Sequence, residues 1–206
     1  MRRYFKYILM GMMTVIMAFG ASAETADGML KKAAAAINGA GGLTASFSID
    51  YGQQKLSGTL KASGRKFALQ TTSTSTWYDG KNMWTYNAKN KETTLMTPTP
   101  QEVAEANPLS IVNSYSASFT AAFAKGQTKG SKTIVLTPKS KQTGYKSVHV
   151  TIPDGSPYPS RLVVIPASGQ KVTVTVSQVA TGQKLAEGTF TYPKSKYPKA
   201  EIIDLR

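Results

Sequence analysis

The stretch from Trp77 to Tyr86 constrains the fold most, because it places both tryptophans of the chain around an Asp-Gly pair at positions 79 and 80. An Asp-Gly pair between two strand-like runs predicts a β-hairpin, since the turn needs positive φ angles that glycine adopts freely. A two-residue loop would set Trp77 opposite Asn82, and a four-residue loop would set Trp77 opposite Trp84. Either loop places Trp77, Trp84 and Tyr86 on one face, whereas a three-residue loop would split the tryptophans. A face this aromatic is either buried in a core or lines a site for an apolar ligand.

The N-terminus has the organisation of a secretory signal peptide. Three basic residues precede a short apolar run from Ile8 to Phe19, and Ala21-Ser22-Ala23 forms a small-x-small cleavage site. The apolar run is shorter than the roughly 20 residues of a membrane-spanning helix, so we expect cleavage after Ala23 rather than an uncleaved anchor. This pattern predicts export to a bacterial periplasm, with residues 24–206 as a single domain.

The amino-acid composition excludes several kinds of site and indicates the charge of the partners. The sequence has no cysteine, which excludes disulfides, thiolate metal sites, cysteine nucleophiles and lipid attachment at a cysteine. Its 25 Lys and Arg residues outnumber the 11 Asp and Glu residues, for a formal net charge of +14. Such a surplus favours anionic partners, such as phospholipid head groups or acidic protein segments. Export and the scattered positions of the lysines argue against nucleic acid as the partner.

The sequence offers little that points to catalysis. His149 is the only histidine and no Ser or Asp pattern singles it out as a general base, so we expect a structural role. Residues 126–133 resemble a phosphate-binding loop, but a serine separates its second glycine from the lysine and a strand follows. Asp50, Asp79 and Glu92 form no evident carboxylate pair, although a glycosidase-like pair that meets only in space stays open. We therefore expect no enzyme, no metal and no cofactor.

Alternating apolar and polar residues predict a mainly β (α+β) protein with an antiparallel sheet that has one polar face. A helix is predicted over 25–38, because apolar residues recur there at helical spacing, and short helical pieces are predicted over 101–106 and 109–112. The segment 114–124 is interpreted as a strand. Besides the hairpin, further strands are predicted over 44–51, 55–62, 67–69, 91–96, 133–137, 147–152, 161–165, 172–179, 185–191 and 202–203.

An open sheet with an apolar face needs cover, since an exposed apolar face of this size promotes aggregation. The segments available are the N-terminal helix and the helical pieces between Pro100 and Val112. If they pack permanently, the face is a core. If they can lift, the face is a cavity for a hydrophobic ligand.

These features resemble the LolA-like family of periplasmic lipoprotein carriers over essentially the whole mature chain. The most specific match is Asp79–Asn87, which is similar to the D-G-K-x-[LM]-W-x-Y-[ND] hairpin of that family. Further matches, in the same order and spacing, are Phe47, Gly58-Thr59-Leu60, Arg65-Lys66-Phe67, Asn107-Pro108, Val135–Lys139, Phe190–Pro193 and Ile203–Arg206.

The resemblance implies an unclosed antiparallel half-barrel with an α-helical lid. Its cavity would take acyl chains of lipoproteins from an inner-membrane lipoprotein-releasing transporter and pass them to an outer-membrane acceptor. Since the acceptor of that system is itself a lipoprotein, the absence of cysteine favours the soluble carrier, which we expect to be a monomer. The resemblance assigns the closing of the lid to an arginine, for which Arg65 is the nearest match. The residues expected to line the cavity are Phe47, Ile49, Leu56, Leu60, Phe67, Leu69, Trp77, Trp84, Tyr86, Leu109 and Ile111.

Two other functions stay open at the level of sequence. One is a periplasmic carrier of another amphiphile, such as a glycolipid or a fatty acyl ligand. The other is a structural β-domain with a dry core. Trp77→Glu or Trp84→Glu would unfold a structural domain, whereas a carrier would still fold and lose its cargo.

Overall fold

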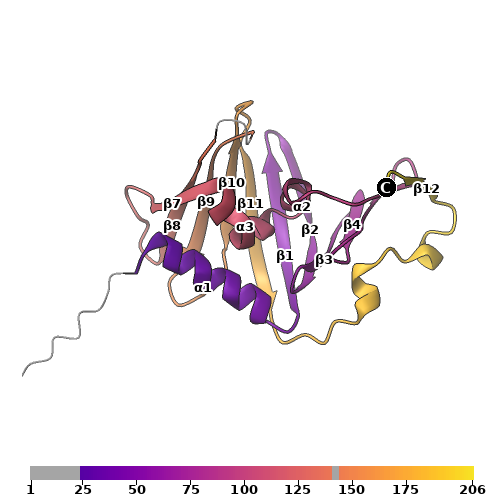
Figure 1. The fold of residues 1–206 in the computed structure, drawn as a ribbon, viewed down its shortest axis with the longest axis horizontal. Helices are drawn as coiled ribbons and strands as arrows, with labels where there is room; N and C mark the ends of the chain where they lie inside the picture. Colours follow the sequence, from indigo (N-terminus) through magenta and orange to yellow (C-terminus); the bar gives the residue numbers. More distant parts are fainter. Residues whose placement is uncertain (1–23, 141–143) are drawn as a thin grey trace, which may run out of the picture.

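The computed structural model describes residues 24–140 and 144–206. Figure 1 shows three α-helices in front of one large β-sheet. The helices are α1 (Ala26–Gly39), α2 (Pro100–Ala106) and α3 (Ile111–Ser118), and the short 3₁₀ helices are η1 (Pro108–Ser110), η3 (Glu187–Phe190) and η4 (Lys194–Lys196). The strands are β1 (Leu43–Tyr51), β2 (Gln54–Ser63), β3 (Lys66–Thr71), β4 (Thr74–Tyr78), β5 (Met83–Asn87), β6 (Glu92–Met96), β7 (Phe119–Phe123), β8 (Ser131–Pro138), β9 (Tyr145–Pro153), β10 (Arg161–Pro166), β11 (Val172–Ala180) and β12 (Glu201–Asp204).

The strands form a single 12-stranded sheet in the order β12-β6-β5-β4-β3-β2-β1-β11-β10-β9-β8-β7. Neighbouring strands are antiparallel, except that β12 runs parallel to β6. Pairing of β1 with β11 joins the two halves of the chain in the middle of the sheet. The strands β12 and β7 lie at the two ends of this order, so the sheet is open, as the sequence predicted.

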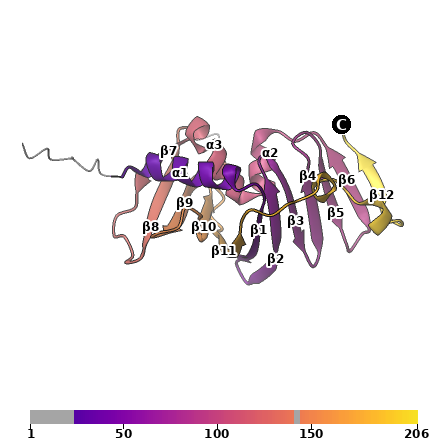
Figure 2. The same cartoon turned by 90° about the horizontal axis from the view of Figure 1, so that it is seen from below.

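All three helices cover the same face of the sheet, which we call the inner face (Figure 2). Phe47, Leu60 and Val150 point to this face, and the residues between them along each strand point to the opposite, outer face. The helix α1 begins where Thr25 Oγ1 accepts a hydrogen bond from the Gly28 amide at 3.0 Å, which caps the first turn. The apolar residues of α1 then recur at helical spacing, so this helix turns one side to the sheet.

The hairpin has a four-residue loop over 79–82, because Trp77 pairs with Trp84 and Tyr78 with Met83. Asp79 Oδ1 accepts hydrogen bonds from the amides of Lys81 and Asn82 at 2.8 and 2.7 Å. Partial burial acts to raise the pKa of Asp79, but these amide hydrogen bonds outweigh it and hold the pKa below its usual value. The predicted shared face of the two tryptophans and Tyr86 is thus confirmed, and Asp79 serves the turn.

Two predicted strands are wrong. The segment 114–124 divides between α3 and β7, because Ile111, Val112 and Tyr115 form one apolar helix face that is buried. The segment 185–191 contains η3 instead of a strand. It follows β11, whose two edges already pair with β1 and β10, so no neighbouring edge is free to receive another strand there.

Candidate apolar binding site

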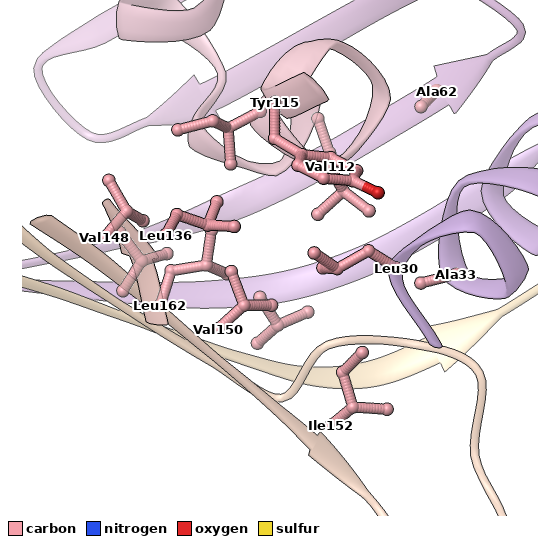
Figure 3. Packing of buried hydrophobic residues seen from close by; sticks show 14 of the residues in the cluster. Leu30, Ala33, Ala62, Val112, Tyr115, Leu136, Val148, Val150, Ile152 and Leu162 are labelled. Carbon is pink, nitrogen blue, oxygen red and sulfur yellow. The ribbon is translucent and has the colours of Figure 1, made fainter. Parts of the chain in front are cut away.

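The inner face has a closed half beneath α1 and α3. Leu30 of α1 and Val112 of α3 meet side chains of β8, β9 and β10 in a tightly packed cluster (Figure 3). Ile134, Leu136, Val148, Val150 and Leu162 are fully buried beneath the helices. These residues belong to the continuous hydrophobic core of the protein.

A polar contact joins the two helices over this core. The Tyr115 hydroxyl of α3 donates a hydrogen bond to Asp27 Oδ1 of α1 at 2.5 Å, and Lys31 pairs with the other carboxylate oxygen at 2.7 Å. The hydrogen bond from Lys31, and then that from Tyr115, hold the pKa of Asp27 below its usual value. Burial and the neighbouring Asp27 raise the pKa of Tyr115 to about 12. The contact therefore favours a charged Asp27 beside a neutral Tyr115.

The helix α2 covers the other half of the inner face and is held differently. None of its residues is buried. Its first turn is completed within the helix: Thr99 Oγ1 accepts from the Glu102 amide at 3.3 Å, and Glu102 Oε2 accepts from the Thr99 amide at 2.7 Å. At its other end the Asn107 amide donates to the Val103 carbonyl at 3.0 Å. Both ends of the helix are thus capped by its own segment, and its half-buried Val103 and Ala106 make its contact with the core.

A cavity of about 170 Å³ lies between α2 and the strands β2 to β4. Leu60 and Phe67 form its floor, Val103 and Leu109 come from the helical segment above, and Arg65 stands in the β2–β3 turn. A smaller apolar space of about 20 Å³ continues from it beneath Leu109, and its lining includes Phe47, Ile49, Leu69, Val174 and Val176.

Gly58 makes room for the ring of Phe47, which lines the smaller space. Phe47 lies opposite Gly58 across the β1–β2 pair. A Cβ atom on Gly58 would come within 2.6 Å of Phe47 Cζ and 2.1 Å of the Gln70 carbonyl oxygen. No side chain fits at this position, so glycine lets the Phe47 ring lie across β2.

Two larger cavities lie on the other side of α2. One of about 420 Å³ lies between α2 and α3 and reaches Phe119 of β7 and Tyr145 of β9. The other, of about 320 Å³, lies above β9 to β11, and Ala104, Ile111 and Tyr145 contribute to both. The larger one shares Pro100 with the cavity above β2 to β4. Apolar space therefore flanks α2 on both sides.

Most of the predicted cavity residues come together on the inner face. Phe47, Ile49, Leu60, Leu69 and Leu109 line one space, Phe67 lines the adjoining one, and Ile111 lines the cavities across α2. Leu56 is half-buried opposite Ile49 and lines none of these spaces. Sequence reasoning missed Val103, Val164 and Val172, although the helical spacing before Asn107 and the alternation in β10 and β11 gave a signal for them.

The prediction that Trp77, Trp84 and Tyr86 stand behind the lid is wrong. These residues point to the outer face, where Phe190, Tyr192 and Tyr197 of the C-terminal segment cover them. The Trp77 ring lies 5.6 Å from that of Tyr192 and 5.9 Å from that of Tyr197, both edge-on. Tyr78 and Met83, which alternate with the tryptophans, point to the inner face instead. Both faces of the hairpin are apolar, so the sequence pattern did not show which of them the helices cover.

The predicted closing contact of Arg65 is also not made. Arg65 is exposed in the turn between β2 and β3 and lines the cavity of about 170 Å³. Within residues 24–140 and 144–206, no hydrogen bond or ion pair joins it to α2 or α3.

The polar candidates lie apart from these cavities. His149 sits in the middle of β9 on the outer face, with its Nε2 3.2 Å from Ser147 Oγ. Across the described part of the chain, no group of three or more His, Asp or Glu side chains is placed to hold a metal ion. Within the same residues, no helix is both long and apolar enough to cross a membrane.

Comparison with known proteins assigns the family. Among solved structures, an uncharacterized conserved protein from Thermus thermophilus is similar, with a TM-score of 0.58 and 14% identity over 85% of this chain and 96% of that one. A DUF1329 family protein from Desulfovibrio piger has a TM-score of 0.50 and 11% identity, over 84% of this chain and 99% of that one. No curated protein sequence matches significantly. A family model described as outer membrane lipoprotein carrier protein LolA matches residues 16–170, well over half of the chain. The chain therefore belongs to the LolA family of outer membrane lipoprotein carrier proteins.

Proposed function

We propose that this protein is a periplasmic carrier that holds the acyl chains of lipoproteins beneath α2 and moves them from the inner to the outer membrane. One observation carries the proposal: α2 buries none of its residues and has apolar cavities on both of its sides. A permanent core would have filled these spaces with side chains, as the cluster of Leu30, Leu136 and Val150 does beneath α1.

Movement of α2 would merge the separate cavities. The two spaces above β1 to β4 share Asn107 and Leu109, and the two larger cavities across α2 share Ile111 and Tyr145. All of them meet at α2 or at the segment that follows it. Ligand sites for small molecules measure roughly 300–1,000 Å³, so the merged space would be large enough to hold an acyl chain.

The chain on either side of α2 suits such a movement. Pro98 precedes the helix and Pro108 follows it, and each restricts helix formation in the residue before it. The capping interactions between Thr99 and Glu102 lie within the moving unit and stay intact when it moves. The helix can therefore move away from the sheet as one rigid unit, with the backbone changes confined to the segments near Pro98 and Pro108.

The energetics favour a carrier that works by exchange. Burial of a methylene is worth about 0.8 kcal/mol, so a chain of ~15 methylenes is worth about 12 kcal/mol. A carrier without an energy source cannot extract such a chain from a bilayer alone. We propose that a membrane transporter loads the protein, that an outer-membrane acceptor unloads it, and that the protein itself catalyses no reaction.

Two measurements test the proposal. The first is mass spectrometry of the full-length protein purified from a bacterial periplasm, for which we expect bound acyl lipid or lipoprotein. The second is titration with the uncharged apolar dye N-phenyl-1-naphthylamine. Val103→Asp places a charge at the cavity and should weaken dye binding about tenfold or more, because an uncompensated charge beside an apolar ligand is costly.

Thr59→Asp is the matched control, since Thr59 is exposed on the outer face of β2. It introduces the same side chain away from the cavities and should leave the affinity unchanged. Absence of both co-purified acyl chains and dye binding would contradict the proposal. Equal loss of binding in the two variants would contradict the location of the site.

A further inference from the structure

Arg65, whose guanidinium is cationic, is one of the residues that line the cavity beneath α2. We propose that this group binds an anionic group near the acyl chain where the cargo carries one, so that among amphiphiles with the same acyl chain the protein prefers the anionic ones. The inference rests on the proposed function, because it concerns the same cavity.

The first step is the lack of any other partner for Arg65. Among the described residues that line this cavity, none is Asp or Glu. The neighbouring Lys66 is already paired with Glu187 of the C-terminal segment. Arg65 is exposed, and its charge is free to meet a ligand.

The second step is that the other polar side chains around the cavity are occupied. The Tyr78 hydroxyl donates to the Gly80 carbonyl at 2.9 Å. Asn113 Oδ1 accepts from Asn38 Nδ2 at 3.1 Å, and Asn107 Oδ1 accepts from the Leu109 amide at 3.2 Å. The hydroxyls of Ser110 and Ser114 donate to backbone carbonyls of their own segment. Among the described residues of this lining, these polar side chains each make at least one hydrogen bond, whereas the charged side chain of Arg65 makes none.

The third step is that the cationic Arg65 stands in an otherwise largely apolar lining. The floor beside Arg65 is apolar, with Ile37, Leu43, Leu60 and Phe67 in the same lining. A guanidinium presents several donors in one plane and binds carboxylate or phosphate through two parallel hydrogen bonds. A ligand with an apolar tail and an anionic group at its head satisfies both parts at once, whereas a neutral amphiphile leaves Arg65 in water.

The test compares ligands with the same twelve-carbon chain and charged or uncharged head groups, by displacement of bound N-phenyl-1-naphthylamine at pH 8. Laurate and dodecyl phosphate should bind roughly three- to tenfold more tightly than methyl laurate, which is the range for a partly exposed charged hydrogen bond. N-palmitoylated Gly-Asp-amide and Gly-Asn-amide extend the comparison to a lipoprotein-like cargo. Inorganic phosphate alone should displace no dye, because it has no acyl chain.

Arg65→Ala should abolish the preference for the anionic ligands and leave the affinity for methyl laurate unchanged, and Arg65→Lys should keep part of the preference. Lys61→Ala removes the same charge from an exposed position on the outer face of β2 and should change nothing. Equal binding of the charged and neutral ligands, or a preference that survives Arg65→Ala, would overturn this inference and leave the carrier function standing. Failure of the dye and of every acyl ligand to bind would overturn the proposed function as well.

Discussion

The helices α3 and α2 cover the same face of one sheet, yet they are anchored in opposite ways. The helix α3 buries Ile111, Val112 and Tyr115, and its tyrosine is hydrogen-bonded to α1. The helix α2 buries no residue and satisfies its first turn from within. The cavities border α2 on both sides and reach residues of α3 such as Ser114, but of these two helices only α3 also contributes buried side chains to the core. On the proposed function, α3 belongs to the scaffold and α2 is the part of the cover that moves.

This division answers the question that the open apolar face raises. A carrier needs a stable scaffold and a site that can open, and local stability in a protein is not uniform. Here the β8–β10 half of the inner face, together with α1 and α3, provides the scaffold. On the proposed function, the half beneath α2 is the space that takes up and releases the cargo.

The contrast between α2 and α3 would lose its meaning if the cargo bound to the tryptophans on the outer face. Trp77 is 2% exposed and is enclosed by Phe190, Tyr192 and Tyr197. Trp77→Ala should lower the free energy of unfolding by about 3–5 kcal/mol, because it leaves a large cavity under the C-terminal segment. Urea unfolding measures the loss, and dye affinity measured well below the unfolding transition should stay the same. A variant of unchanged stability that loses dye binding would place the site on the outer face after all.

A pair of leucine substitutions sharpens the contrast between the two halves of the inner face. Leu136→Ala, beneath α1 and α3, should cost about 2–5 kcal/mol of unfolding free energy, since Leu136 is fully buried in a packed core. Leu109→Ala should cost only about 1 kcal/mol, because Leu109 is half-buried beside two cavities. The affinity for the dye should show the reverse pattern: Leu109→Ala should change it, and Leu136→Ala should not. Equal stability losses would mean that the two halves are packed alike.

The smallest effect concerns the contact that ties α3 to α1. The pKa of Asp27 is lower in the folded state, so its contribution is present at neutral pH and is lost as the pH falls below its usual value of 3.8. The pKa of Tyr115 is raised from 10 to about 12, so stability should also fall as the pH rises from 10 to 12. Thermal unfolding across pH should show both losses, and Asp27→Asn should weaken the acid one. Tyr115→Phe should reduce the alkaline one, to which Tyr145 also contributes because burial raises its pKa. A Tyr115→Phe variant with the alkaline loss unchanged would show that this tyrosine is not the titrating group.

Much of the architecture followed from local patterns, and the errors have definite physical causes. Helical spacing and Thr25 located α1, and the Asp-Gly pair located the hairpin with Trp77 opposite Trp84. Alternation along a strand separates its two faces but does not say which face the helices cover, and in this hairpin both faces are apolar. The aromatic cover of Trp77 comes from a segment more than 100 residues later, and contacts at that separation leave no local pattern. For the same reason the sequence could name Phe47, Leu60 and Leu109 as apolar candidates but could not show that cavities flank α2.

Hydrogen exchange of backbone amides, followed by mass spectrometry with and without bound laurate, tests the central claim most directly. If α2 is a movable cover over a rigid core, amides of residues 100–106 should exchange much faster than those of residues 111–118, and laurate should slow exchange in α2 with little change in α3. The opposite outcome would be equally slow exchange in both helices together with no effect of laurate on α2. That result would mean that α2 is as fixed as α3, and it would contradict the account of this face as a cavity with a movable lid.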